Sequence, residues 1–247
     1  MYYRSPLFPK PATEVSLPSN DCGASTGGMV QGIRILISVT IRPKFPLAQI
    51  GLYLVPVRYQ FKQRITIAKR YYIVVDFEAT CWPDESRRAD VEIIEFGCVK
   101  MTIQAGKVLS EFFTLVRPTR YPKLSTYCID LTSITQADVD AAPAFPEALK
   151  SFTEWMGDPT ECILCSWGAY DKFLLMQACR FNRVSYPFDD EYINIKPAFS
   201  EAFSGRGVSM ERAMEMMEIP EEGRKHRALN DARNAAKLWQ QILRARR

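Results

Sequence analysis

The feature that most constrains this chain is an apolar run that ends abruptly in two acids. The run from Tyr71 to Val75 reads YYIVV, and Asp76-Phe77-Glu78 follows without a break. It shows no alternation of polar and apolar residues and is rich in aromatic and β-branched side chains, which is typical of a strand buried on both faces. A strand of this kind needs helices over both sides of its sheet. The sequence therefore predicts an α/β fold.

The two acids at the end of this strand predict a site for a cation. Side chains alternate across a strand, so Asp76 and Glu78 are expected on the same side, about 6.6 Å apart along the strand. Neighbouring carboxylates that lose hydration repel each other, and a positive group must compensate them. Mg²⁺ or Mn²⁺ prefers oxygen ligands and keeps waters that a phosphate can displace. Two alternatives stay open: the acids begin a turn, or they pair with arginines such as Arg87 and Arg88.

A third carboxylate follows a second predicted strand. The stretch from Cys162 to Trp167 is mostly apolar, Gly168 interrupts it, and a helical pattern over residues 169–182 comes next. We expect Asp171 in the first turn of this helix, near the carboxyl end of the strand, where α/β sheets form their sites. The alternative is that Asp171 only begins the helix, because helix N-termini favour acidic residues.

The remaining candidates lie together near residue 230. His226 is the only histidine among 247 residues, and it stands five positions before Asp231 in KHRALNDARN. The pattern predicts a helix from about residue 228 to residue 244 that contains Asp231. Histidine gains and loses a proton near neutral pH, which suits the general base of a hydrolase. The alternative is that this lone histidine is a surface or packed residue.

Taken in order, these segments resemble the motifs of a known enzyme family. DFEAT after an apolar strand, GAYD at a strand-to-helix junction, and H-x-x-x-x-D before a late helix resemble the three motifs of the DEDDh 3′–5′ exonucleases. The intervening VEIIEFGCV and FTLVRPTRYPKLSTYCIDLTSITQADVDAAPAFPEAL resemble the subgroup of histone-mRNA and RNA-interference exonucleases and bacterial KapD-type proteins. The resemblance covers residues 71 to about 245.

The resemblance implies roles for five residues. Asp76, Glu78, Asp171 and Asp231 match the ligands of two divalent ions, Mg²⁺ or Mn²⁺, and His226 and Glu78 match the catalytic positions. One ion would activate a water and the other would stabilise the departing 3′ oxygen. His226 would accept the proton of the attacking water. The implied product is a nucleoside 5′-monophosphate released from the 3′ end of RNA.

Other functions share much of this pattern. A DNA-directed proofreading or repair exonuclease would carry the same catalytic residues, and only the phrases between the motifs favour RNA. A non-catalytic, ribonuclease-H-like nucleic-acid-binding module is disfavoured because all five residues are present. An endonuclease of the ribonuclease H type would not need His226 at this spacing.

Five further positions are candidates for contact with the terminal nucleotide. Phe77 and Ala79 flank the carboxylates, and Tyr170 precedes Asp171, where relatives carry an aromatic residue that stacks on the last base. The resemblance places Leu124 and Ser125 in a loop that packs on the terminal sugar and base. For each position, ordinary core or loop packing is the alternative.

The charge distribution indicates how such a chain would hold its substrate. Residues 71–247 contain 22 Lys and Arg and 26 Asp and Glu, so the candidate catalytic segment is acidic. Two divalent ions would bring it close to neutral. No basic patch is evident, so we expect the site itself and aromatic stacking to hold RNA, or DNA in the alternative. A protein partner is expected to select longer substrates, and the oligomeric state is not indicated.

The organisation of the chain follows from the same patterns. Three strand-like stretches come in succession, with Gln104-Ala105-Gly106 as a hairpin turn between the second and third, and helical patterns follow. This order matches the ribonuclease-H-like mixed sheet flanked by helices that the resemblance implies, in a domain of residues 71–247. The predicted strands cover 71–76, 91–103 and 107–116, and the predicted helices cover about 145–157, 169–182, 196–204, 208–217 and 228–244.

Residues 1–70 form a separate basic extension. They contain 10 Lys and Arg against 2 Asp and Glu, and seven of the 16 prolines. Their apolar stretches, 33–41 and 47–57, are too short to span a bilayer, and no membrane association is expected. Three interpretations stay open: an organelle-targeting segment, a tether for RNA or another partner, or upstream sequence translated from a misassigned start. The third is slightly favoured.

Cysteine usage favours a reducing compartment. Seven cysteines is an odd number, and most lie in apolar runs, which suits free thiols better than a disulfide framework. We therefore expect a cytoplasmic location, with organellar targeting by residues 1–70 left open. Cys162 and Cys165 do not predict a zinc site, because no second pair exists and their spacing on a strand points the thiols to opposite faces.

Overall fold

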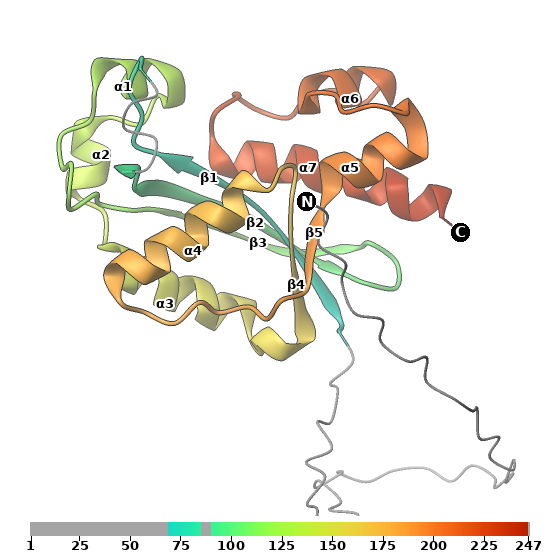
Figure 1. Cartoon of the computed structure of the whole chain (residues 1–247), viewed down its shortest axis with the longest axis horizontal. Helices are drawn as coiled ribbons and strands as arrows, with labels where there is room; N and C mark the ends of the chain where they lie inside the picture. Colours follow the sequence, from blue (N-terminus) through green and yellow to red (C-terminus); the bar gives the residue numbers. More distant parts are fainter. Residues whose placement is uncertain (1–68, 85–89, 247) are drawn as a thin grey trace, which may run out of the picture. The chain divides into compact units, whose positions relative to one another are not determined.

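The computed structural model describes residues 69–84 and 90–246. Within this part, five strands form one sheet in the order β3-β2-β1-β4-β5, with helices on both of its faces (Figure 1). The three interpretations of the N-terminal extension fall outside the described residues, and its boundary at residue 70 stays a prediction. The strands are β1 (Tyr71–Ala79), β2 (Ile93–Thr102), β3 (Val108–Leu115), β4 (Cys162–Ser166) and β5 (Tyr192–Asn194).

The sheet is mixed, as the sequence predicts. The strands β1, β2 and β3 are antiparallel neighbours, whereas β4 and β5 run parallel to β1. The predicted turn between β2 and β3 is confirmed, because Thr102 donates its N–H to the carbonyl of Lys107 at 2.9 Å and Gly106 adopts a positive φ of 61°. The strand β1 lies at the centre of the sheet, so its carboxyl end is flanked by strands on both sides.

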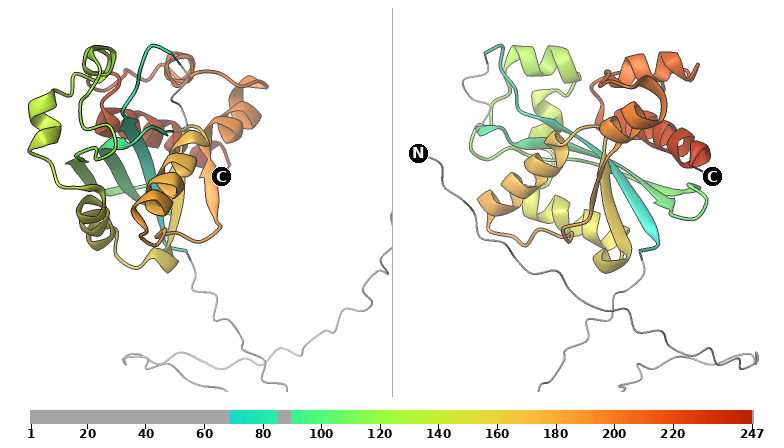
Figure 2. Two further views of the ribbon diagram at one scale, coloured as in Figure 1. Left: turned by 60° about the vertical axis from the view of Figure 1, so that its left-hand side comes forward. Right: turned by 45° about the vertical axis from the view of Figure 1, so that its right-hand side comes forward.

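The two faces of β1 enter two separate cores. Ile73 packs under α3 (Phe145–Met156) and α4 (Tyr170–Asn182), whereas Val74 packs under α7 (Ala228–Ala245). Both side chains are fully buried, and Figure 2 shows the helices on the two sides of the sheet. This double burial is the physical reason for the unbroken apolar run.

The cysteine pair of β4 follows the same division. Cys162 belongs to the core beneath α3 and α4, and Cys165 belongs to the core beneath α7. The predicted orientation to opposite faces is therefore confirmed. The six cysteines of the described residues are all free thiols.

Most predicted helices are present, with two additions. The helix predicted over 196–204 is divided into α5 and a π-helical turn, η3, and two short helices before α3 were not predicted. Their capping signals are visible: Ser125 accepts the N–H of Cys128, and Thr135 and Asp138 form a capping box. No helix in the described part is long and apolar enough to cross a membrane. The remaining elements are α1 (Thr126–Thr132), α2 (Gln136–Asp140), η2 (Pro159–Glu161), α5 (Ile195–Phe199), η3 (Ser200–Ser204) and α6 (Met210–Met216).

Candidate active site

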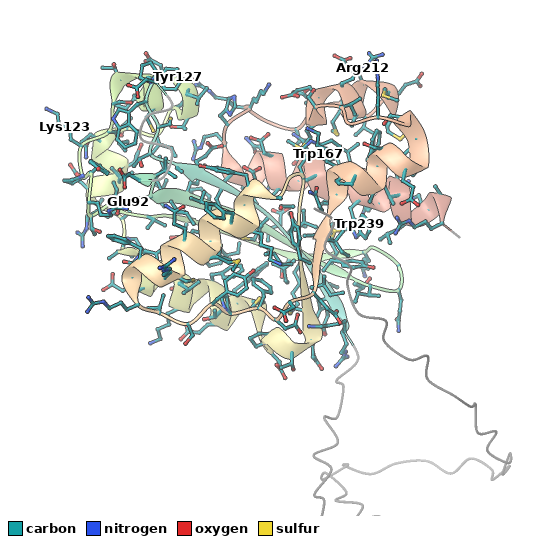
Figure 3. All side chains as sticks on the ribbon, viewed as in Figure 1. Glu92, Lys123, Tyr127, Trp167, Arg212 and Trp239 are labelled. Atoms are coloured by element: carbon teal, nitrogen blue, oxygen red, sulfur yellow. The ribbon has the colours of Figure 1, made fainter. Side chains whose placement is uncertain are left out.

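Three carboxylates from two elements converge at the carboxyl end of β1. Asp76 and Glu78 of β1 and Asp231 of α7 each offer an oxygen, and these oxygens lie within 4.8 Å of one another. Asp76 and Glu78 therefore share a side of the strand, as predicted. Glu78 is 9% exposed and Asp231 is 6% exposed, so most of their hydration is lost. In Figure 3, Tyr127 of α1 and Arg212 of α6 mark the two sides of this end of the molecule.

A close contact between α7 and β2 brings Asp231 over the sheet. Gly97 of β2 faces the first turn of α7, and a Cβ atom at this position would lie 2.0 Å from the carbonyl carbon of Ala228. Only glycine permits this approach. Since Gly97 pairs with Asp76 across the strands, this contact determines how closely α7 approaches the part of the sheet that carries Asp76.

Asp171 joins the site through the backbone of β1. It lies in the first turn of α4, as predicted, and its Oδ1 accepts the N–H of Phe77 at 3.2 Å. The side chain is 8% exposed. Asp171 does not belong to the group of oxygens within 4.8 Å, which contains only Asp76, Glu78 and Asp231.

The electrostatics of the four carboxylates call for positive charge. Burial, followed by the charges of Asp171, Glu78 and Asp231, raises the pKa of Asp76 well above its usual range. Burial also raises the pKa of Glu78 to about 8, of Asp171 to about 7 and of Asp231 to about 6. Backbone N–H groups oppose this rise at Asp171 and at Asp231. Four acids that have lost much of their hydration and have raised pKa values fit a cradle for divalent cations, because cations would favour their ionised forms.

His226 lies beside this cluster on the segment that precedes α7. Its backbone has a positive φ of 59°, and its N–H donates to Oδ2 of Asp231 at 2.8 Å. The ring is partly buried and makes no hydrogen bond to the described residues. Burial, followed by the charge of Lys225, lowers the pKa of His226. The structure thus fixes the main chain of His226 against the site, while its imidazole is not part of the carboxylate group.

The comparison with known families agrees with this arrangement. The exonuclease family RNase_T matches residues 73–239, which include all five of these residues. The chain belongs to this family. Its mixed sheet with flanking helices is the ribonuclease-H-like fold of the DEDDh exonucleases.

The chain is similar in sequence to curated proteins that are named as exoribonucleases. It is 34% identical over 185 residues to 3′-5′ exoribonuclease 1 of Rattus norvegicus, covering 70% of this chain and 53% of the relative. It is 30% identical over 205 residues to ERI1 exoribonuclease 2 of Danio rerio, covering 73% of this chain and 37% of the relative. The chain therefore spans about half or less of the length of these curated relatives.

A solved structure shows the same fold. The nuclease domain of 3′hExo, described as a DEDDh family member bound to rAMP, superimposes with a TM-score of 0.66 at 31% sequence identity. The match covers 71% of this chain and 92% of that chain. The similarity therefore extends over nearly the whole of the solved nuclease domain.

Glu95 has a structural role that the sequence patterns do not predict. It lies on β2 opposite Glu78, is fully buried, and uses both carboxylate oxygens. One oxygen accepts from Nε and from a terminal nitrogen of Arg227, at 3.0 and 2.7 Å, and the other accepts the N–H of Ala228 at 2.8 Å. Glu95 thus holds the residues that connect His226 to α7. An acid inside a buried strand was the signal that could have found it.

Glu92 plays a comparable part for the loop that follows β3. Its carboxylate accepts the backbone N–H groups of Thr119, Arg120 and Tyr121 at 2.8–2.9 Å. The role of Glu92 is likewise not predicted by the sequence patterns. The two acids of VEIIE therefore each hold the backbone of a segment that is distant in the sequence.

The candidate substrate contacts next to the carboxylates lie in different surroundings. The ring of Phe77 is 6% exposed and packs edge-to-face on Phe96, and its N–H is bonded to Asp171. Ala79 ends β1, and its carbonyl accepts the thiol of Cys128. These contacts show packing and structural roles, so a nucleotide contact at Phe77 or Ala79 stays a prediction.

The other three candidates divide in the same way. Leu124 is 7% exposed, and Ser125 caps α1 while donating its hydroxyl to the carbonyl of Cys81 at 2.6 Å. Tyr170, in contrast, is 42% exposed at the start of α4. Of the five predicted contacts, Tyr170 therefore presents the most accessible side chain for stacking.

Proposed function

We propose that the chain is a divalent-metal-dependent 3′–5′ exoribonuclease that releases nucleoside 5′-monophosphates. The observation that carries this proposal is the convergence of Asp76, Glu78 and Asp231, with Asp171 held against the same strand end. Membership of the exonuclease family supports the reaction class. The names of the relatives and the rAMP bound to the solved nuclease domain support RNA as the substrate.

Asp76, Glu78, Asp171 and Asp231 are proposed to hold two Mg²⁺ or Mn²⁺ ions. The fit rests on the chemistry of the donors, because these are buried carboxylates whose raised pKa values report uncompensated negative charge. When bound, such ions supply an acidified water and positive charge at a phosphodiester. The protein supplies the rigid frame that keeps four acids side by side despite their repulsion.

His226 is the proposed general base. Its lowered pKa leaves the imidazole neutral at physiological pH, which is the form that accepts a proton from an attacking water. Its backbone N–H donates to Asp231, so the main chain of His226 is held beside the carboxylates while the imidazole can still rotate. Glu78 is the proposed catalytic carboxylate beside it.

The principal test follows shortening from the 3′ end. Single-stranded and stem-loop RNA labelled at the 5′ end is incubated with the full chain in Mg²⁺, in Mn²⁺ or in chelator. We expect a ladder that shortens from the 3′ end only with metal, and ribonucleoside 5′-monophosphates as products. Cleavage of a circular RNA, or activity that persists in chelator, would contradict the proposal.

The alternative of a DNA-directed exonuclease is separated by a matched pair of oligonucleotides. The same sequence is prepared as RNA and as DNA, and the initial rates are compared at equal concentration. We expect faster hydrolysis of RNA. Equal or faster hydrolysis of DNA would favour the proofreading or repair function, and absence of both activities would favour a binding module.

A cytoplasmic location and a protein partner for substrate selection are further proposals. The six free thiols of the described residues support a reducing compartment. Fractionation of cells and co-purification with an RNA-bound complex would test the two proposals separately.

A further inference from the structure

The outer side of α4 exposes an unusual number of large apolar side chains. Nine large hydrophobic residues are exposed in the described part of the chain, and four of them lie on this single helix of 13 residues. Phe173 is 61% exposed, the highest value of the nine. We call Tyr170, Phe173, Met176 and Phe181, with Arg180 between them, the α4 outer face.

The periodicity of the helix places these residues on one side. At about 100° per residue, the α4 outer face spans about 140°, and the opposite side carries Leu174, Leu175 and Ala178 in the core. A helix packed on a sheet normally turns polar residues to solvent. The exposed aromatic residues of α4 therefore lie outside the buried core.

The exposed charges that α4 itself carries are basic. The helix and its C-cap carry Lys172, Arg180 and Arg183, and the only acid is Asp171, which is buried in the site. The guanidinium of Arg120 lies 4.3 Å from the centre of the Phe181 ring and extends the face beyond the helix, although its charge is paired with Asp90 at 2.7 Å. This local charge stands out because residues 71–247 are acidic overall.

The face begins at the site described above. Tyr170 is the first residue of the helix and directly precedes Asp171, whose carboxylate contacts the backbone of β1. From Tyr170 to Phe181 the helix rises about 16 Å, enough for several nucleotides of a single strand. Aromatic rings interleaved with arginine are the surface on which unpaired bases stack and a phosphate chain is neutralised.

We propose that the α4 outer face binds the single-stranded RNA upstream of the 3′-terminal nucleotide, an inference that rests on the proposed exoribonuclease function. Phe173 and Phe181 stack on bases, and Arg180 contacts the phosphate chain. No basic patch is evident in the sequence because the residues of the α4 outer face are separated by core positions along the chain. The continuity with Asp171 and the absence of exposed acids on the helix favour RNA over a protein partner.

This face acts on long substrates and leaves the shortest ones unaffected. A ribodinucleotide occupies only the positions next to the carboxylates, whereas a 12-nucleotide strand also reaches Phe173 and Phe181. Loss of one stacking contact lowers affinity for the longer strand by about tenfold. The difference between the two substrates therefore isolates the face from the catalytic residues.

The experiment compares three variants of the full chain, Phe173→Ala, Phe181→Ala and Arg180→Ala, with two exposed controls. Leu109→Ala removes a 47% exposed apolar side chain from β3, and Arg206→Ala removes an exposed charge from the segment before α6. Each protein is assayed on the ribodinucleotide and on the 12-nucleotide RNA. Thermal unfolding confirms that each variant is folded.

We expect the face variants to raise KM about tenfold for the 12-nucleotide RNA, with dinucleotide hydrolysis and both controls unchanged. Unchanged KM for the long RNA, or an equal loss on both substrates, overturns the proposal. Binding of a fluorescent 12-nucleotide RNA, measured by anisotropy in chelator, tests the face independently of hydrolysis. A parent chain that hydrolyses neither substrate contradicts the proposed function, whereas unchanged RNA binding by the face variants contradicts the face.

Discussion

The carboxylate cluster and the segment that carries His226 are neighbours, but they are built differently. Asp76 and Glu78 lie on the central strand β1, and Asp231 lies on α7, the longest helix of the described residues; both elements contribute many buried side chains to the hydrophobic cores. The segment from Met217 to Arg227 has no regular structure and contains three residues with positive φ, Glu218, Gly223 and His226.

The difference has a physical reason. Acids that repel one another must be held by a rigid frame, because otherwise they would move apart or take up protons. A base has no such repulsion to overcome, and a segment fixed by a few contacts is sufficient. The N–H of Glu222 donates to Asn234, and Asn230 donates to the carbonyl of Arg224, so the segment is tied to α7 by polar contacts.

The largest effect is expected from removing one carboxylate of the rigid region. Asp76→Asn should lower turnover by at least about 1,000-fold and abolish divalent-ion binding, because the cluster loses a central acid. Single-turnover hydrolysis and calorimetric titration with Mn²⁺ measure the two quantities. Tight Mn²⁺ binding by this variant would show that the cluster is not the metal site.

The second prediction concerns the base. His226→Ala should lower kcat by about 100- to 10,000-fold while Mn²⁺ affinity stays close to that of the parent. The pH profile of the parent should rise with pH through a value below 6.5, because His226 must be neutral to accept a proton. Loss of this acidic limb in the variant, together with partial rescue by added imidazole, would support the role. Equal metal loss in Asp76→Asn and His226→Ala would contradict the division between the two regions.

The third prediction tests the connection between the regions. Glu95→Gln weakens the buried hydrogen bonds to Arg227 and Ala228, so stability should fall by about 1.5–3 kcal/mol and kcat by roughly tenfold, with little change in KM. Glu111→Gln is a matched control, because Glu111 also accepts two hydrogen bonds from an arginine of α7, Arg233, but is partly exposed. A shifted pH profile only in Glu95→Gln would identify a positioning role rather than a general loss of stability.

The last prediction, which leaves the chemistry of the reaction aside, is a dependence of stability on pH. Glu78, Asp171 and Asp231 have folded-state pKa values of about 8, 7 and 6, above about 4 in an unfolded chain. Between about pH 4 and pH 8 the metal-free folded state therefore binds more protons than the unfolded state does. The stability that these three groups contribute is fully present below about pH 4 and should be lost as pH rises to 8, by on the order of a few kcal/mol.

Metal should offset this loss. Thermal unfolding from pH 5 to pH 8, with chelator and with Mg²⁺, measures the effect, and Mg²⁺ should stabilise the protein more at pH 8 than at pH 5. Asp231→Asn provides a control with a weaker dependence on pH. A metal-free protein that becomes more stable from pH 5 to pH 8 would contradict the raised pKa values.

The sequence predicted the local parts of this molecule well. The strand β1, the hairpin between β2 and β3 and the long helix α7 are each specified by a continuous pattern of burial or by a turn residue. Short elements were missed, because α1 and α2 have too few residues for a periodic pattern and depend on caps formed by Ser125 and Thr135. The five predicted site positions each stand at the end of a strand pattern or near the start of a helical pattern.

By itself, the sequence determined which acids stand at the ends of buried elements, since alternation and helical periodicity are local properties of the chain. Only the tertiary structure decided that Asp231 meets β1, through the close approach at Gly97, and that Glu95 holds Arg227 across 132 positions. It also decided that Phe173 faces solvent rather than the core. Contacts between distant segments depend on which elements pack against each other. A periodic pattern shows that a face is buried, but it does not show which partner covers that face.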